Sequence, residues 1–120
     1  MKNIFLGLTV TLLMTACASS SSNKPLYYWD SAYDKSVYNR LNKDGDVDKE
    51  IQNMEKMAQK AYEKQQKVPP GFHAHLGLLY HHVGNMPKMQ ENFQKEAELY
   101  EESRTYMEFL LKSKTQGGKK

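Results

Sequence analysis

Four histidines are the residues of this chain whose type and spacing most suggest chemistry. They are His73, His75, His81 and His82, and imidazole is a common zinc ligand and proton carrier. On an α-helix only His75 and His82 would share a face, and they would lie two turns, or about 10.5 Å, apart. One divalent ion cannot span that distance without ligands from another element. We therefore predict no metal site and expect exposed histidines beside a groove.

A second cluster, in segment 42–48, has a carboxylate or amide at every second position, as a calcium-binding loop does. With Gly45 at the obligatory turn position, however, Arg40 takes the place of the first ligand and Ile51 that of the bidentate acid. The register fails, so we predict a turn in which Asp46 caps the following helix.

Nothing in the sequence indicates catalysis. It contains no nucleophile elbow, no phosphate-binding glycine loop and no carboxylate pair in an apolar setting. The 17 basic and 14 acidic residues are interspersed, which argues against a nucleic-acid partner. We expect no enzyme, no cofactor and no small-molecule substrate. Several acids lie among lysines and are interpreted as a solvated helix face: Glu91, Glu96, Glu98, Glu101 and Glu102.

The N-terminus predicts export. Lys2 precedes an apolar run over 4–14 that is too short to span a bilayer, so residues 1–16 are predicted to be a cleaved secretion signal. Met14-Thr15-Ala16-Cys17 resembles the lipobox of bacterial lipoproteins, and Cys17 is the only cysteine. We predict that Cys17 carries the lipid that anchors the protein to the membrane. Ala18, where an Asp would retain a lipoprotein at the inner membrane, favours the periplasmic face of the outer membrane.

The remaining chain is predicted to hold one small domain, near the size at which a single core is marginal. Segment 17–25 is expected to be the lipidated cysteine and a flexible tether, 26–114 the helical domain, and 115–120 a basic disordered tail.

Within that domain, apolar residues recur at helical spacing in five segments separated by turn signals. Asp30 or Ser31, Asp46 and Ser103 are candidate N-caps, Val68-Pro69-Pro70-Gly71 ends the second segment, and Pro87 suits the first turn of the fourth. The five predicted core stripes are Trp29, Tyr33, Val37 and Leu41; Val47, Ile51, Met54, Ala58, Ala61 and Tyr62; Phe72, Leu76, Leu79, Tyr80 and Val83; Met86, Met89, Phe93, Ala97 and Tyr100; and Tyr106, Met107, Leu110 and Leu111.

Two helical pairs and a final helix resemble a short tetratricopeptide-like array, which is the predicted all-α fold. Leu76-Gly77, Tyr80, Gly84-Asn85 and Phe93 fall at the signature positions of one repeat. Gly77 is expected to let the two helices of its pair approach closely.

The chain from Leu26 to Leu111 also resembles a family of small proteobacterial lipoproteins, domain of unknown function 4810. The resemblance is carried by five segments: Tyr27-Tyr28-Trp29, Val37-Tyr38, Val68-Pro69-Pro70-Gly71, Leu76-Gly77-Leu78-Leu79-Tyr80 and Glu98-Leu99-Tyr100-Glu101-Glu102-Ser103. It implies a periplasm-facing helical lipoprotein, often encoded beside a lipoprotein that resembles the curli secretion channel. It implies no catalytic residues.

Two surfaces are candidates for contact with a partner. Tyr27, Tyr28 and Trp29 precede the first helix, and they either form a contact site or pack as a lid over the core. His75, Leu78 and His82, spaced three and four apart, lie off the core stripe, on the face that lines the groove of tetratricopeptide-like pairs.

Two functions of different classes follow. In the first, the protein is a lipid-tethered adaptor that binds an envelope protein, as an accessory to a curli-channel-like secretion or assembly system. In the second, it is a structural or self-associating accessory of the envelope.

Overall fold

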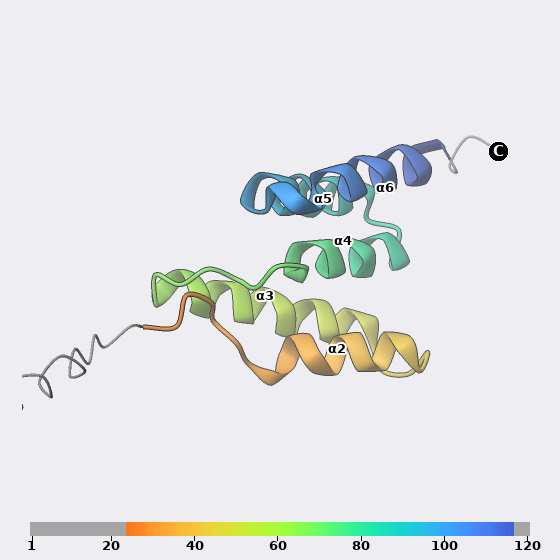
Figure 1. Cartoon of the computed structure of the whole chain (residues 1–120). Helices are drawn as coiled ribbons and strands as arrows, with labels where there is room; N and C mark the ends of the chain where they lie inside the picture. The colour runs from red at the N-terminus through yellow and green to blue at the C-terminus, as the bar shows by residue number, and fades with distance from the viewer. Residues whose placement is uncertain (1–23, 117–120) are drawn as a thin grey trace, which may run out of the picture.

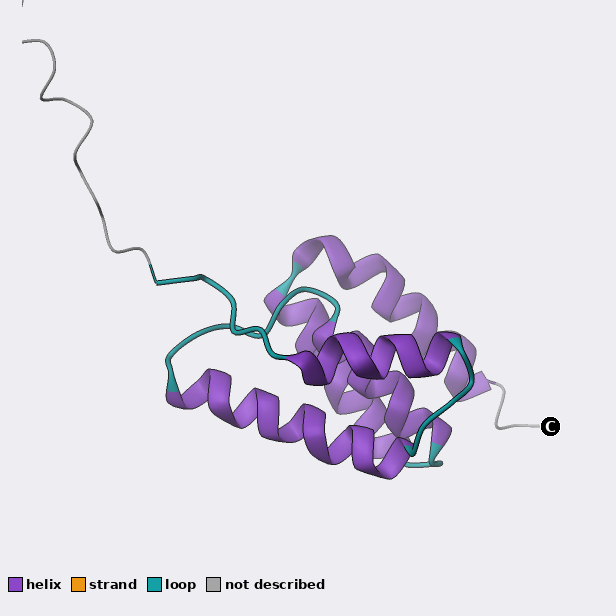
Figure 2. Ribbon diagram, turned by 90° about the horizontal axis from the view of Figure 1, so that it is seen from below, coloured by secondary structure: helices purple, strands orange, loops and turns teal. Residues whose placement is uncertain are grey.

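The computed structural model describes residues 24–116, and that part of the chain is an all-α array (Figure 1). Helices and connecting loops make up the whole of the described chain, which contains no strand (Figure 2). The predicted array of two helix-turn-helix pairs and a C-terminal helix is confirmed. Its elements are α2 (Ser31–Leu41), α3 (Val47–Glu63), α4 (Phe72–His82), α5 (Met86–Leu99), the short 3-10 helix η2 (Glu101–Ser103) and α6 (Arg104–Gln116).

Side-chain caps start three of these helices; Asp30 and Asp46 are the caps that the sequence predicted, and Asn85 was not predicted as a cap. The carboxylate of Asp30 accepts a hydrogen bond from the Ala32 N–H, and Asp46 and Asn85 do the same for the N–H groups three residues further on. Such bonds satisfy donors that have no partner inside the helix. Pro87 lies in the first turn of α5, as predicted.

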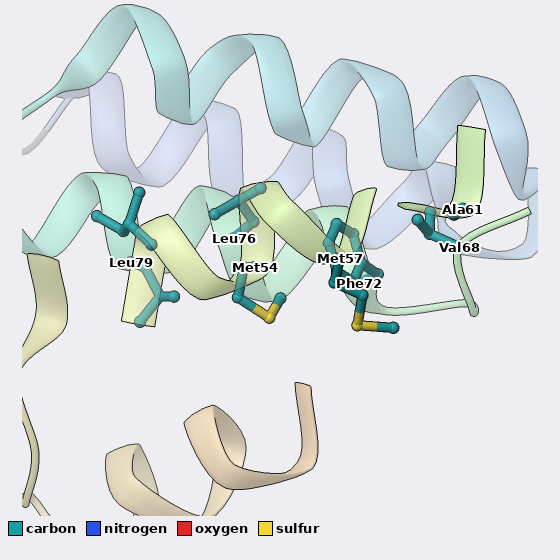
Figure 3. Close-up of a cluster of buried hydrophobic side chains, with 8 residues drawn as sticks. Met54, Met57, Ala61, Val68, Phe72, Leu76 and Leu79 are labelled. Carbon is teal, nitrogen blue, oxygen red and sulfur yellow. The ribbon is translucent and has the colours of Figure 1, made fainter. Parts of the chain in front are cut away.

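The pairs stack so that the core lies in two clusters. The first fills the space between α3 and α4, with Phe72, Leu76 and Leu79 facing the methionines of α3 (Figure 3). The second joins α5 and α6 and consists of Met89, Phe93, Met107 and Leu110. Methionine therefore contributes to both clusters, as its core spacing predicted.

Gly77 brings α4 and α5 together, as expected. A Cβ atom built on Gly77 would lie 2.5 Å from Cε1 of Phe93, which is closer than carbon atoms approach. The ring of Phe93 therefore rests directly on the backbone of α4. This contact places two signature positions of the repeat against each other.

Two residues of the predicted core stripes of α3 and α4 are exposed. Tyr62 is exposed to solvent. Met57, which the predicted stripe left out, is fully buried. Both Met57 and Ala58 fit the spacing from Met54, so spacing alone does not select between them. Val83 is the C-cap of α4, so its side chain leaves the helix after the last buried turn.

The predicted stripe of α2 is wrong at both ends. Trp29 precedes the N-cap Asp30 and is 54% exposed, while Leu41, at the last turn, is 79% exposed. The one buried residue of α2 is the polar Ser36. Helix α2 therefore packs through Tyr33 and polar contacts more than through an apolar stripe.

The C-terminal helix differs from its prediction in one core residue and in its end. It begins at Arg104, directly after the predicted cap residue Ser103, but Tyr106 is exposed whereas its neighbour Met107 is buried. It continues to Gln116, two residues into the tail predicted to be disordered.

Candidate protein-binding surface

The carboxylate of Glu96 joins three elements beneath the surface of the array. Glu96 is fully buried, so its assignment to a solvated face was wrong. Its Oε1 accepts hydrogen bonds from the Gly71 N–H at 2.7 Å and the Ser103 hydroxyl at 3.1 Å. Gly71 is the N-cap of α4 and has no side chain to cap the helix, so a carboxylate of α5 does so. One sequence signal could have predicted the burial of Glu96: it occupies a position at which tetratricopeptide-like repeats usually have alanine.

His75 packs between α4 and α2. Its Nε2 forms a 2.7 Å hydrogen bond with the hydroxyl of Ser36, which is itself buried. Burial lowers the pKa of His75; the carboxylate of Glu50 acts against this shift, and the guanidinium of Arg40 adds to it. The imidazole is thus held in its neutral form at a helix junction.

His73 lies on the other side of α4 and contacts α5. Its Nδ1 is 2.9 Å from Oδ1 of the buried Asn92, and burial lowers its pKa as well. The expectation of exposed histidines is therefore wrong for His73 and His75. Their polar partners come from helices distant in sequence, which periodicity on α4 does not reveal.

Leu78 and His82 lie on the face of α4 that no other helix covers. At 100° per residue, Leu78 falls between Ala74, which packs against the second core cluster, and His75, which contacts α2. Leu78 is 37% exposed, whereas the adjacent Leu79 is 1% exposed. Leu78 is therefore an apolar side chain at the centre of an open helix face.

The three aromatic residues before α2 divide between the two expected roles. Tyr27 packs edge-on against Tyr100 at 6.3 Å, and Tyr28 packs against the first core cluster beneath the ammonium group of Lys64. Both are half-buried and form part of a lid. Trp29 remains exposed.

Tyr33 connects Trp29 to the face of α4. Its ring stacks on Trp29 at 5.8 Å and lies 5.9 Å from the ring of His75. The structure thus brings two of the predicted contact regions together, and we call Trp29, Tyr33, His75, Leu78 and His82 the α2–α4 surface. Tyr28 does not belong to it. The spacing of four between Trp29 and Tyr33 is the sequence signal for the link.

A hollow of about 280 Å³ also lies between α5 and α6, lined by Ala97, Met107, Leu111 and flanking polar residues. No group of three or more histidine, cysteine, aspartate or glutamate side chains within residues 24–116 is placed to hold a metal ion. None of the helices described is both long and apolar enough to cross a membrane.

The predicted signal 1–16, the lipidation site Cys17 and the tether up to residue 23 lie outside the described residues, as does segment 117–120.

Comparison with known proteins identifies a family. A family model described as Domain of unknown function (DUF4810) matches residues 26–110, which covers all helices of the array except the end of α6. No curated protein and no solved structure matches the chain.

Proposed function

The chain belongs to the family Domain of unknown function (DUF4810), and from its geometry we propose that it is a lipid-anchored, non-enzymatic adaptor of the bacterial envelope. The α2–α4 surface binds a segment of another envelope protein. The observation that carries this proposal is the exposed apolar side chain of Leu78 on α4, the helix whose His75 lies beside Tyr33, on which the exposed ring of Trp29 stacks.

Several properties of the α2–α4 surface support protein binding. Its side chains come from helices that the core and the Glu96 cap hold in place, so little order has to be gained on binding. Exposed aromatic and aliphatic groups on a rigid base are typical of contact sites. His82 is exposed at the edge of this surface and can hydrogen-bond a peptide backbone or side chain.

The proposed partner segment is apolar and either extended or helical, because a helical array offers a long open face rather than a closed pocket. Val37 and Leu41 follow Tyr33 at spacings of four on α2 and extend the surface along that helix. A partner segment lying across α2 and α4 would cover both rows of side chains.

The proposed anchor is the lipid on Cys17, which follows a lipobox-like sequence. The expected location is the periplasmic face of the outer membrane, and an assembly with a curli-channel-like lipoprotein is the proposed setting. Replacing Cys17 by Ser is expected to leave the protein unacylated and to release it from the membrane fraction. Continued co-fractionation of this variant with outer membranes would contradict the anchor.

A photo-crosslinking experiment in intact cells tests the adaptor function. A photoreactive residue at position 78 should capture a discrete envelope protein, whereas the same residue at Gln90, exposed on α5, should not. Leu78→Glu, with the crosslinker moved to position 82, should abolish capture. Equal labelling from positions 78 and 90 would contradict the α2–α4 surface as the binding site.

One observation favours the alternative, self-association of an envelope accessory. Tyr106 and Phe109 stack at 6.5 Å on α6 and are 57% and 62% exposed, although terminal helices of arrays usually present a polar outer face. A monomer in a solution mass measurement of the unlipidated protein favours the adaptor. A fixed oligomer that Phe109→Glu converts to monomers favours self-association.

A further inference from the structure

A row of lysines follows the groove between α2 and α3. Lys35 and Lys49 line a hollow of about 410 Å³, which continues into a second hollow of about 340 Å³. The two hollows share the lining residues Ala32, Lys35 and Asn53. Lys56 and Lys60 line the second hollow. Lys24 and Lys64 line a third at the end of α3.

The six lysines carry charge that nearby acids do not neutralise. None of them belongs to an ion pair in the described chain, where the pairs are Arg40 with Glu50 and Glu91 with two lysines of α5. Three acids line the same hollows, Asp30, Asp46 and Glu50, so the six lysines outnumber them, and Glu50 is already paired with Arg40. The groove therefore presents a net positive surface.

The spacing of these lysines is unfavourable for the helix itself. Lys56, Lys60 and Lys64 follow one another at i, i+4, where like charges destabilise an isolated α-helix. Two acids near these lysines on α3 have hydrogen-bond partners of their own: Glu55 accepts from the Tyr80 hydroxyl, and Glu63 from the Gln59 amide. An anionic ligand would relieve this repulsion.

We propose that this lysine row binds the anionic headgroups of the membrane to which the protein is tethered. This inference rests on the proposed lipid anchor. Cys17 precedes Lys24 by seven residues, at most about 25 Å of extended chain. Lys24 lines the third hollow, so a lipid at Cys17 would hold this end of the groove within reach of the headgroups. All six side chains are exposed, and long basic side chains near an anionic bilayer gain electrostatic attraction.

Such binding would also orient the domain. With the groove between α2 and α3 against the bilayer, the opposite side of the array would face the periplasm. The lipid would supply the first attachment, and the lysine row would supply a second one that depends on charge. Removal of charge from the row would change the orientation of the domain without removing it from the membrane.

Vesicle co-sedimentation tests the proposal. The probe protein is the chain from residue 17 with Cys17→Ser, so that no lipid contributes. It is expected to bind vesicles of mixed phosphatidylglycerol and phosphatidylcholine and not those of phosphatidylcholine alone, and high salt should release it. The double variant Lys56→Gln/Lys60→Gln should bind on the order of 30-fold more weakly.

The matched control is Lys88→Gln/Lys95→Gln, which removes the same charge from α5, where Glu91 already pairs with both lysines. It should bind nearly as the parent does, and both variants should stay folded, with unfolding free energies within about 1 kcal/mol of the parent's. Equal binding to neutral and anionic vesicles, or an equal loss of vesicle binding in both variants, would overturn the proposal.

An acidic protein segment is the alternative ligand. Binding to soluble polyglutamate through Lys56 and Lys60, without binding to anionic vesicles, would overturn the proposal in favour of such a segment. A failure here leaves crosslinking at position 78 unaffected, so the two proposals are separable.

Discussion

The buried carboxylate of Glu96 on α5 caps α4, the other helix of its pair, by accepting a 2.7 Å hydrogen bond from the backbone N–H of Gly71. A second oxygen of the same carboxylate lies 3.4 Å from the Ala74 N–H. The negative charge thus lies at the positive end of the α4 dipole, where it is stabilised. This contact fixes the start of the helix that carries His75, Leu78 and His82.

We expect Glu96→Ala to destabilise the domain by about 3 kcal/mol, because it leaves the Gly71 and Ser103 donors buried without an acceptor. Glu96→Gln keeps one acceptor oxygen and should cost less. Glu98→Ala, on the exposed side of the same helix, is the control and should change stability little. Urea unfolding followed by circular dichroism measures all three. Equal midpoints for Glu96→Ala and Glu98→Ala would refute the capping role.

The contact between Gly77 and Phe93 predicts a coupling that a double-mutant cycle can measure. Gly77→Ala should cost about 1 to 3 kcal/mol, because the new methyl group would overlap the ring of Phe93. In a Phe93→Leu background most of that cost should vanish, since the ring is gone. Gly84→Ala, where no atom lies near the added Cβ, should cost the same in both backgrounds. A cost of Gly77→Ala that is independent of residue 93 would be inconsistent with this packing.

Phe93→Ala itself should cost on the order of 3 to 5 kcal/mol, since the fully buried ring leaves a cavity in the second core cluster. A domain of this size would then be largely unfolded. The measurement is the denaturant midpoint, and an unchanged midpoint would show that Phe93 does not pack as described.

Two adjacent leucines separate surface from core on α4. Leu79→Glu should unfold the domain, because it buries a charge among Leu76 and the residues of α3. Leu78→Glu should fold with a stability within about 1 kcal/mol of the parent, because its side chain reaches solvent. Thermal unfolding of both variants measures this difference in stability. If both unfold alike, Leu78 is a core residue and the α2–α4 surface loses its centre.

The neutral imidazoles of His73 and His75 predict a loss of stability in mild acid. Burial lowers the pKa of both groups below 6.5 in the folded protein, so around and below pH 6.5 the unfolded chain binds more protons. Folding free energy is then fully present above pH 6.5 and declines as the pH falls toward the lowered pKa values. His75→Gln, which keeps a polar group beside Ser36, should flatten this decline between pH 7.5 and 5. Urea midpoints across that range measure it, and parallel curves for parent and variant would argue against the assignment.

The sequence by itself determined the elements of this protein and the starts of α2 and α3. Asp30 and Asp46 are local caps that act on neighbouring backbone groups, so they could be recognised without tertiary contacts. The end of α3 was predicted wrongly, because that helix ends at Glu63 and not at the Val68-Pro69-Pro70-Gly71 segment. The closeness of α4 and α5 was also predictable, because a glycine at position 77 has few other uses in a helix.

Only the tertiary structure decided which side chains are buried where spacing allowed two choices. Met57 and Ala58 both fit the spacing from Met54 on α3, and packing against α4 fully buries Met57. Glu96 and His75 are polar residues whose partners, Gly71 and Ser36, lie 25 and 39 residues away. A polar group is stable in the interior only when such a partner is in place, and its position depends on the stacking of whole helices. The residues that shape the α2–α4 surface were therefore determined by the fold, and the helices that carry them by the sequence.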